Sequence, residues 1–118
     1  MDKKLNKRLL KLLFDHKEEH VGSCFTCKDI FILSNGHAGY ALYSILEKYY
    51  NHIDADELAK KHMGHPNLDE ENHIYCSTGS LGSGILIAIG RALGNPNRKV
   101  YVTLSDGECA EGSVWEGL

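Results

Sequence analysis

Apolar and polar positions along this chain repeat at helical spacing more often than at strand spacing. The first such set lies near the N-terminus, with lysine and arginine between its members: Leu5, Leu9, Leu12 and Leu13. This pattern predicts an amphipathic packing helix over residues 2–16. The second set follows residue 37: Ala38, Leu42, Ile45, Leu46 and Tyr49. It predicts another helix, after the turn formed by Ser34-Asn35-Gly36. Asp54 then N-caps a short predicted helix over residues 55–62.

The second half of the chain changes character. Residues 64–76 are polar and loop-like, and the small residues from Ser77 to Gly84 open a helix with few bulky polar side chains, as expected of a helix buried in a larger body. Residues 99–105 are rich in β-branched and aromatic types, which predicts a buried strand, and a further helix is expected to begin near Glu111. The apolar run at residues 31–33 is short, so only one strand is convincing. The alternation of helix and strand predicts the α/β class.

Composition and charge narrow the functions that are open to the chain. It has 118 residues, 42% of them hydrophobic, and a net charge of -3, so it lacks the polybasic surface that nucleic acid or an anionic membrane requires. Charged residues interrupt every apolar run before it reaches the roughly 20 residues of a membrane span, which favours a cytoplasmic protein. The four cysteines are interpreted as reduced thiols, because the pair Cys24 and Cys27 has no second pair to complete a zinc site.

One candidate for chemistry follows the predicted strand directly. Asp106 and Gly107 stand where, in an open α/β sheet, ligands bind beyond the carboxyl ends of the strands. The Asp106 carboxylate is a hard oxygen ligand suited to Mg²⁺ or Ca²⁺, and Gly107 would let the backbone approach a phosphate. Taken alone, Asp-Gly is also an ordinary turn, so both interpretations stay open.

Glycine-flanked segments supply two further candidates. The loop Ser77–Gly84 is neither a P-loop nor a dinucleotide fingerprint, so it either cradles a ligand through its backbone or permits tight helix packing. His20, His37 and His65 each stand close to a glycine, and histidine can donate to phosphate or sugar oxygens and transfer protons. A further set of histidines keeps an ordinary surface or core interpretation: His16, His52, His62 and His73.

Four motifs in order over residues 31–118 resemble the N-terminal region of transketolase and of its split, two-subunit relatives, which use thiamine diphosphate. FILSNGHAGYALYSIL is similar to the family pattern F-V/I-L-S-x-G-H-x-x-x-x-L-Y, and GHPN is similar to the family loop G-H-P-E. STGSLGSGILIAIGRAL resembles T-T-G-P-L-G-Q-G-I, and LSDGECAEGSVWEGL resembles G-D-G-x-x-x-E-G-x-x-x-E-A. A weaker match, EHVGS, extends the resemblance to His20. The resemblance implies a partial thiamine diphosphate-binding fold, with a parallel sheet flanked by helices, in a single incomplete diphosphate-binding domain over residues 1–118.

The resemblance also implies roles for individual residues. Asp106 matches a ligand of the Mg²⁺ (or Ca²⁺) that holds the diphosphate, and Gly107 matches a residue whose backbone N–H contacts the same group. His37 matches a histidine at the diphosphate, whereas His20 and His65 match histidines that face the sugar substrate. These three histidines form the implied catalytic set.

The remaining implied residues line the cofactor. Gly79, Ser80 and Leu81 match positions beside the thiazolium and aminopyrimidine rings, with Ser80 in place of the usual proline. Glu111 and Glu116 match acidic residues near the cofactor and the dimer contact, although both are also ordinary acids for the start of a helix.

Departures from the family pattern limit the implied function. The family's second metal-ligating residue, an asparagine, and its pyrimidine-binding domain have no counterpart in residues 1–118, and the chain is shorter than the family between Cys24 and Phe31. The expected protein is therefore a partial transketolase-like subunit that transfers a two-carbon ketol unit from a ketose phosphate to an aldose only within a hetero- or homo-oligomer of complementing chains. The alternatives are a non-catalytic remnant that binds such a complex, and a different thiamine diphosphate reaction on an unusual sugar.

Overall fold

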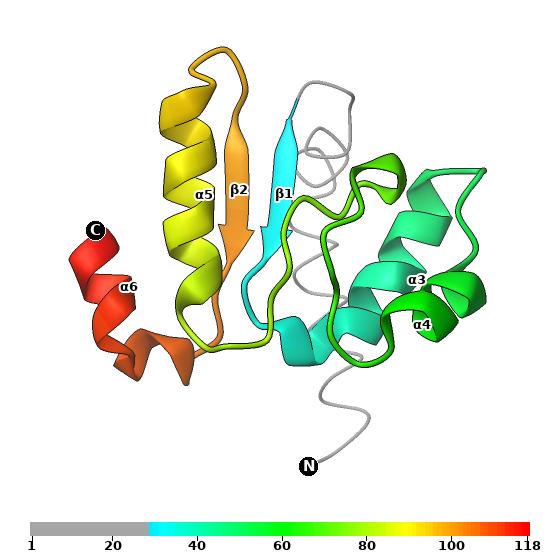
Figure 1. Ribbon diagram of the computed structural model, residues 1–118, viewed down its shortest axis with the longest axis horizontal. Coiled ribbons are helices and arrows are strands. Elements are labelled where there is room, and N and C mark those ends of the chain that lie inside the picture. The colour runs from blue at the N-terminus through cyan, green and yellow to red at the C-terminus, as the bar shows by residue number, and fades with distance from the viewer. Residues whose placement is uncertain (1–28) are drawn as a thin grey trace.

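The computed structural model describes residues 29–118 (Figure 1). In chain order the elements are β1 (Ile30–Leu33), η1 (Gly36–Ala38), α3 (Gly39–Tyr49), α4 (Ala55–His62), η2 (Glu70–Asn72), α5 (Ser83–Gly94), β2 (Val100–Thr103), η3 (Glu108–Ala110) and α6 (Gly112–Gly117), where η denotes a 3₁₀ helix. The predicted helix at residues 2–16 lies outside the described residues, as do His20 and the Cys24–Cys27 pair. Among residues 29–118, no helix is long and apolar enough to cross a membrane.

The two strands pair in parallel, with Ile30 opposite Val100 and Leu33 opposite Thr103. Just beyond the paired residues, the Ser34 N–H donates to the Thr103 carbonyl oxygen at 3.1 Å, so the pairing continues to the carboxyl ends of both strands. Because the strands are parallel, the loops that follow them leave from the same edge of the sheet. The predicted α/β class, with a parallel sheet flanked by helices, is confirmed.

Helices cover both faces of β1, because successive side chains of a strand point to opposite sides. Ile30 and Ile32 pack with Ala88 of α5 in one buried cluster. Phe31 and Leu33 point the other way, against a second cluster built mainly on α3 and α4: Leu42, Tyr43, Leu46, Ile53, Leu58 and Ile74. Figure 1 shows the corresponding arrangement, with α5 on one side of the strand pair and α3 and α4 on the other.

The α4 helix forms as the sequence predicts. Asp54 lies in extended conformation, and its Oδ1 accepts hydrogen bonds from the N–H groups of Asp56 (2.8 Å) and Glu57 (3.1 Å). These bonds satisfy two of the N–H groups that a helix start leaves unpaired. After α4 ends at His62, the chain continues into Gly64-His65-Pro66.

Three sequence-based expectations are corrected. The apolar run at residues 31–33 belongs to a second strand, β1, so one convincing strand was too few. The strand at residues 99–105 was predicted to be buried, but β2 is half-buried, because β1 is its only partner among the described residues. Helix α5 was predicted to be buried, and in the described structure it buries one face only: Leu86, Ile87 and Leu93 are exposed.

Candidate functional site

The loops that follow the two strands lie at one edge of the sheet and carry three of the predicted site residues. Ser34 directly follows β1 and leads to His37 in η1, whereas β2 leads to Asp106 and Gly107 ahead of η3. The carboxyl edge of a parallel sheet is the usual position for ligands in α/β proteins. The candidate site is therefore assembled at this edge, from segments that are far apart in the sequence.

Three of the predicted residues come together at the loop before α5. The rings of His37 and His65 meet edge to face, with centroids 4.7 Å apart and planes at 80°. A Cβ atom placed on Gly79 would lie 3.1 Å from Cδ2 of His65, so the Gly79 backbone lies against the same ring. Both histidines are exposed. The motifs that contain these residues are thus neighbours in space, with two imidazole rings open to a ligand.

The backbones of two motifs touch at Gly36. A Cβ atom on Gly36 would lie 2.5 Å from both the carbonyl carbon and the carbonyl oxygen of Thr78, and 2.7 Å from the backbone nitrogen of Gly79. A Cβ atom essentially never comes closer than 3.0 Å to a heavy atom outside its own residue and the two neighbouring ones. Only glycine therefore allows the turn after β1 to approach the loop at residues 77–82 so closely.

The segment that carries His65 is held at two points, Pro66 and Asp69. On one side, the Thr78 N–H donates to the carbonyl oxygen of Pro66 at 3.1 Å. On the other side, Oδ2 of Asp69 accepts three hydrogen bonds: from Lys61 Nζ (2.8 Å), Asn72 Nδ2 (2.9 Å) and His62 Nε2 (3.0 Å). Burial would by itself raise the pKa of Asp69, but the hydrogen bonds from Lys61, Asn72 and His62, with the Lys61 charge, lower it to about 2. This carboxylate therefore joins the end of α4 to the segment after Pro66, and His65 lies between.

Asp106 is exposed, and its Oδ1 accepts the Gly107 N–H at 2.9 Å. The side chain thus still has Oδ2 to offer, a hard oxygen ligand of the kind that Mg²⁺ and Ca²⁺ prefer. The space around the Cα atom of Gly107 is open, since a Cβ there would meet no atom within 4 Å. Among residues 29–118, no group of three histidine, cysteine, aspartate or glutamate side chains could hold a metal. Among the described residues, Asp106 could thus offer a single carboxylate oxygen to a cation, and its role as a metal ligand stays a prediction.

The other predicted residues lie around the loop at residues 77–82 and the start of α6. Ser80 and Leu81 are exposed. Glu111 is also exposed and precedes α6, and a Cβ atom on Gly82 would lie 3.0 Å from its Cβ atom. Among the described residues, no hydrogen bond or ion pair joins the His37–His65 pair to Asp106. The assigned roles of these residues remain predictions.

The sequence pattern did not single out the residue with the most hydrogen bonds at this edge. Glu108 is completely buried, and its carboxylate accepts hydrogen bonds from Ser34 Oγ (2.5 Å), the Gly82 N–H (3.1 Å), and the N–H (2.9 Å) and Oγ (3.2 Å) of Ser105. Burial alone would raise the pKa of Glu108, but these hydrogen bonds, led by that of Ser34, hold it below the usual value. Nothing in the local pattern separates Glu108 from exposed Glu111, because its partners Ser34 and Gly82 lie 74 and 26 positions away.

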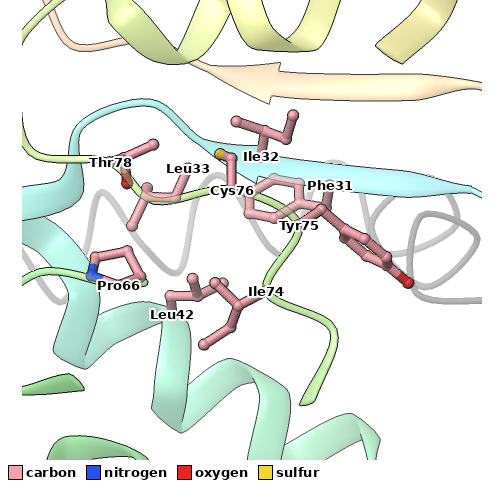
Figure 2. A pocket seen from close by; sticks show the side chains of 9 residues that line it. All are labelled: Phe31, Ile32, Leu33, Leu42, Pro66, Ile74, Tyr75, Cys76 and Thr78. Atoms are coloured by element: carbon pink, nitrogen blue, oxygen red, sulfur yellow. The ribbon is translucent and has the colours of Figure 1, made fainter. Parts of the chain in front are cut away.

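A small pocket lies between β1, α3 and the segment at residues 66–78 (Figure 2). Its volume is about 10 Å³, room for about one water molecule. Thr78 lines this pocket, and its hydroxyl is buried with no hydrogen-bond partner in residues 29–118. This pocket is far too small for an organic cofactor. The predicted cofactor residues are instead found in the loops at the carboxyl edge of the sheet.

Comparison with known proteins assigns this chain to a protein family. The family model described as "transketolase, thiamine diphosphate binding domain" matches residues 8–117. The chain belongs to this family, and the resemblance seen in the sequence is confirmed.

Individual relatives are consistent with that assignment. The chain is similar to one subunit of the apulose-4-phosphate transketolase of Phocaeicola vulgatus, with 28% identity over 145 residues, 96% of this chain and 51% of that protein. The subunit of the same name from Actinobacillus succinogenes is 34% identical over 103 residues, 75% of this chain and 36% of the relative. Human transketolase is 35% identical over 100 residues, 76% of this chain and 16% of the relative. The chain thus spans about half, or less, of these relatives.

Proposed function

We propose that this chain supplies the diphosphate side of a thiamine diphosphate site in a transketolase-type transferase, and that complementing chains supply the rest. The observation that carries the proposal is the meeting of His37, His65 and Gly79, three residues from three family motifs, with both imidazole rings exposed. Two relatives are named as one subunit of a transketolase, which supports a function within a complex of several chains.

Each residue has a role in the proposal. Asp106 ligates Mg²⁺ (or Ca²⁺) through its open carboxylate oxygen, and His37 donates a ring N–H to a diphosphate oxygen. Gly107 contributes its N–H as well; this group now donates to Asp106, so it must share or exchange that bond when the diphosphate binds. Gly79, Ser80 and Leu81 line the cofactor rings, and Glu111 lies beside them.

The reaction that we propose is the transfer of a two-carbon ketol unit from a ketose phosphate to an aldose. Thiamine diphosphate, when bound, supplies the electron sink for breaking and making the carbon–carbon bond. His65 and His20 bind hydroxyl groups of the sugar, and their ring nitrogens accept and return the protons that these groups exchange. A sugar phosphate substrate is supported by the two relatives whose names contain apulose-4-phosphate.

The test is titration calorimetry of thiamine diphosphate with Mg²⁺ against the purified chain, alone and mixed with a chain that carries a transketolase pyrimidine-binding domain. Asp106→Asn keeps an acceptor for the Gly107 N–H but removes the charge, and Asp56→Asn, on the exposed first turn of α4, is its matched control. We expect binding in the mixture that Asp106→Asn abolishes and Asp56→Asn leaves unchanged. A folded chain that binds nothing in either setting would instead be a non-catalytic member of a transketolase-like complex.

The same mixture tests the substrate assignment. A panel of ketose phosphate donors and aldose acceptors is offered to the complex, and ketol transfer is followed by the loss of the donor. Transfer from a ketose phosphate supports the proposed reaction. Turnover confined to another class of carbonyl compound would assign the chain to a different thiamine diphosphate reaction.

A further inference from the structure

We propose that Glu108 is a positioning residue for the cofactor site, and that its buried carboxylate fixes the three segments on which the diphosphate and metal depend. This inference rests on the proposed function. It differs from the roles assigned above, because Glu108 is completely buried and acts through its neighbours rather than on the cofactor itself.

The contacts of Glu108 connect three separate segments. Oε1 accepts from Ser34 Oγ, at the end of β1, and from the Gly82 N–H, ahead of α5. Oε2 accepts from the N–H and the hydroxyl of Ser105, after β2. One carboxylate therefore holds the carboxyl ends of both strands and the start of α5 together.

Each of these segments carries residues of the proposed site. Ser34 leads through the turn to His37, and Ser105 directly precedes Asp106. Leu81, the last residue of the predicted ring-lining loop, directly precedes Gly82. The positions of the metal ligand, the diphosphate-binding histidine and the ring-lining loop are thus fixed relative to one another by Glu108.

Gly84 and Ser34 pack so closely that these segments cannot move nearer to each other to replace a lost hydrogen bond of Glu108. A Cβ atom on Gly84, in the first turn of α5, would lie 2.5 Å from the Cα atom of Ser34 and 2.6 Å from its Oγ. The α5 backbone therefore presses directly on the serine that donates to Glu108. If the hydrogen bonds are lost, the segments can separate, but the start of α5 and Ser34 cannot come closer.

The hydrogen-bond donors around Glu108 explain why a carboxylate is required at this position. A buried charge is costly unless it is paired or hydrogen-bonded, and among the described residues Glu108 has no ion-pair partner. Each of its two oxygens faces a backbone N–H, of Gly82 or of Ser105, and a backbone N–H can only donate. A glutamine would have to turn its NH₂ group toward one of them, so Glu108→Gln leaves two donors facing each other whichever way the amide is oriented.

The experiment compares two variants in the complex of the full chain with a chain carrying the pyrimidine-binding domain. Ser34→Ala removes one donor and keeps the carboxylate, and Glu108→Gln keeps the size but not the second acceptor. Ile53→Val, in the buried cluster on α3 and α4, is the matched control for a general loss of stability. Three quantities are measured: the dissociation constant of thiamine diphosphate with Mg²⁺, the denaturant midpoint of the chain, and the hydrogen–deuterium exchange of the Gly82 and Ser105 amides.

We expect Ser34→Ala to weaken thiamine diphosphate binding about tenfold, because the buried Glu108 carboxylate loses one hydrogen bond. Glu108→Gln should weaken binding more. The Gly82 and Ser105 amides should exchange faster in both variants, whereas Ile53→Val should lower the midpoint and leave both the affinity and these two amides unchanged. Wild-type affinity in both variants would overturn the inference, as would affinity losses no larger than the loss in Ile53→Val. If the wild-type complex itself binds no thiamine diphosphate, the proposed function fails first and the positioning role fails with it.

Discussion

The ring of His37 contacts the ring of His65 edge to face, with 4.7 Å between their centroids. These residues belong to different motifs, one in the 3₁₀ turn after β1 and the other after α4. Neighbouring residues support the two histidine-bearing loops. Gly36 lies against the Thr78 backbone, and the Thr78 N–H donates to the Pro66 carbonyl oxygen. Asp69, after Pro66, hydrogen-bonds to His62 at the end of α4. The two imidazoles are thus exposed side chains on a firmly packed support, which is the arrangement that a binding site requires.

The proposed division of labour between the two histidines gives the first prediction. His65→Gln in the complex should leave the dissociation constant of thiamine diphosphate within about threefold of wild type and lower the rate of ketol transfer by roughly 10²-fold or more, because proton transfer is lost. His37→Gln should instead weaken cofactor binding. Calorimetry and steady-state rates separate the two effects. His52→Gln, an exposed histidine after α3, is the control and should change neither; the assignment is wrong if His65→Gln is fully active.

Gly36 and Gly90 form a contrasting pair for a second prediction. Gly36→Ala places a methyl group 2.5 Å from the Thr78 backbone and should lower the free energy of unfolding by about 1–3 kcal/mol. Gly90→Ala, in the interior of α5 with nothing within 4 Å of its added atom, should raise it by up to about 1 kcal/mol, because alanine is the better helix former. Chemical denaturation of the two variants measures both. Equal stability of Gly36→Ala and wild type would mean that the close approach of the two loops is not needed.

Local signals predicted most of the helices. The residues that define α3 and α4 lie within one or two turns of one another, and the Asp54 cap bonds to residues only two and three positions away. Both the position of α4 and the residue at which it begins can therefore be predicted from neighbouring residues alone.

Long-range pairing explains what the sequence could not predict. The four residues of β1 become a strand only by pairing with Val100–Thr103. Glu108 resembles any exposed acid near a helix start until Ser34 and Gly82 are brought to it by the fold. Individual site residues such as Asp106 and His65 could be proposed from motifs, but the buried group that connects their segments is defined only in three dimensions.

Asp69 gives a pH-dependent prediction. Its pKa is lowered from 3.8 to about 2 in the folded chain, so its stabilising contribution is complete above about pH 4 and is lost as the pH falls toward 2. The shift corresponds to at most about 2–3 kcal/mol, and solvent screening of the exposed Lys61 reduces this contribution to stability. Asp69→Asn should therefore destabilise the chain at pH 7 and match wild type near pH 2. Denaturant titrations at several pH values test this, with the nearby exposed Glu71→Gln expected to change stability by less than about 0.5 kcal/mol. A difference that is independent of pH would refute the electrostatic explanation.

The two described cysteines should differ sharply in reactivity. Burial raises the pKa of Cys76 to about 11, against a smaller opposite effect of Arg91, and the thiol is almost inaccessible, whereas Cys109 is exposed. The thiolate is the reacting form, so a rise from 9.0 to about 11 lowers the reactive fraction of Cys76 near pH 8 by roughly a hundredfold, before its burial is considered. Iodoacetamide should therefore label Cys109 at least ten times faster than Cys76, as followed by peptide mass spectrometry. In denaturant the two rates should converge, and comparable labelling of both thiols in the folded chain would show that the packing around β1 and α5 opens readily.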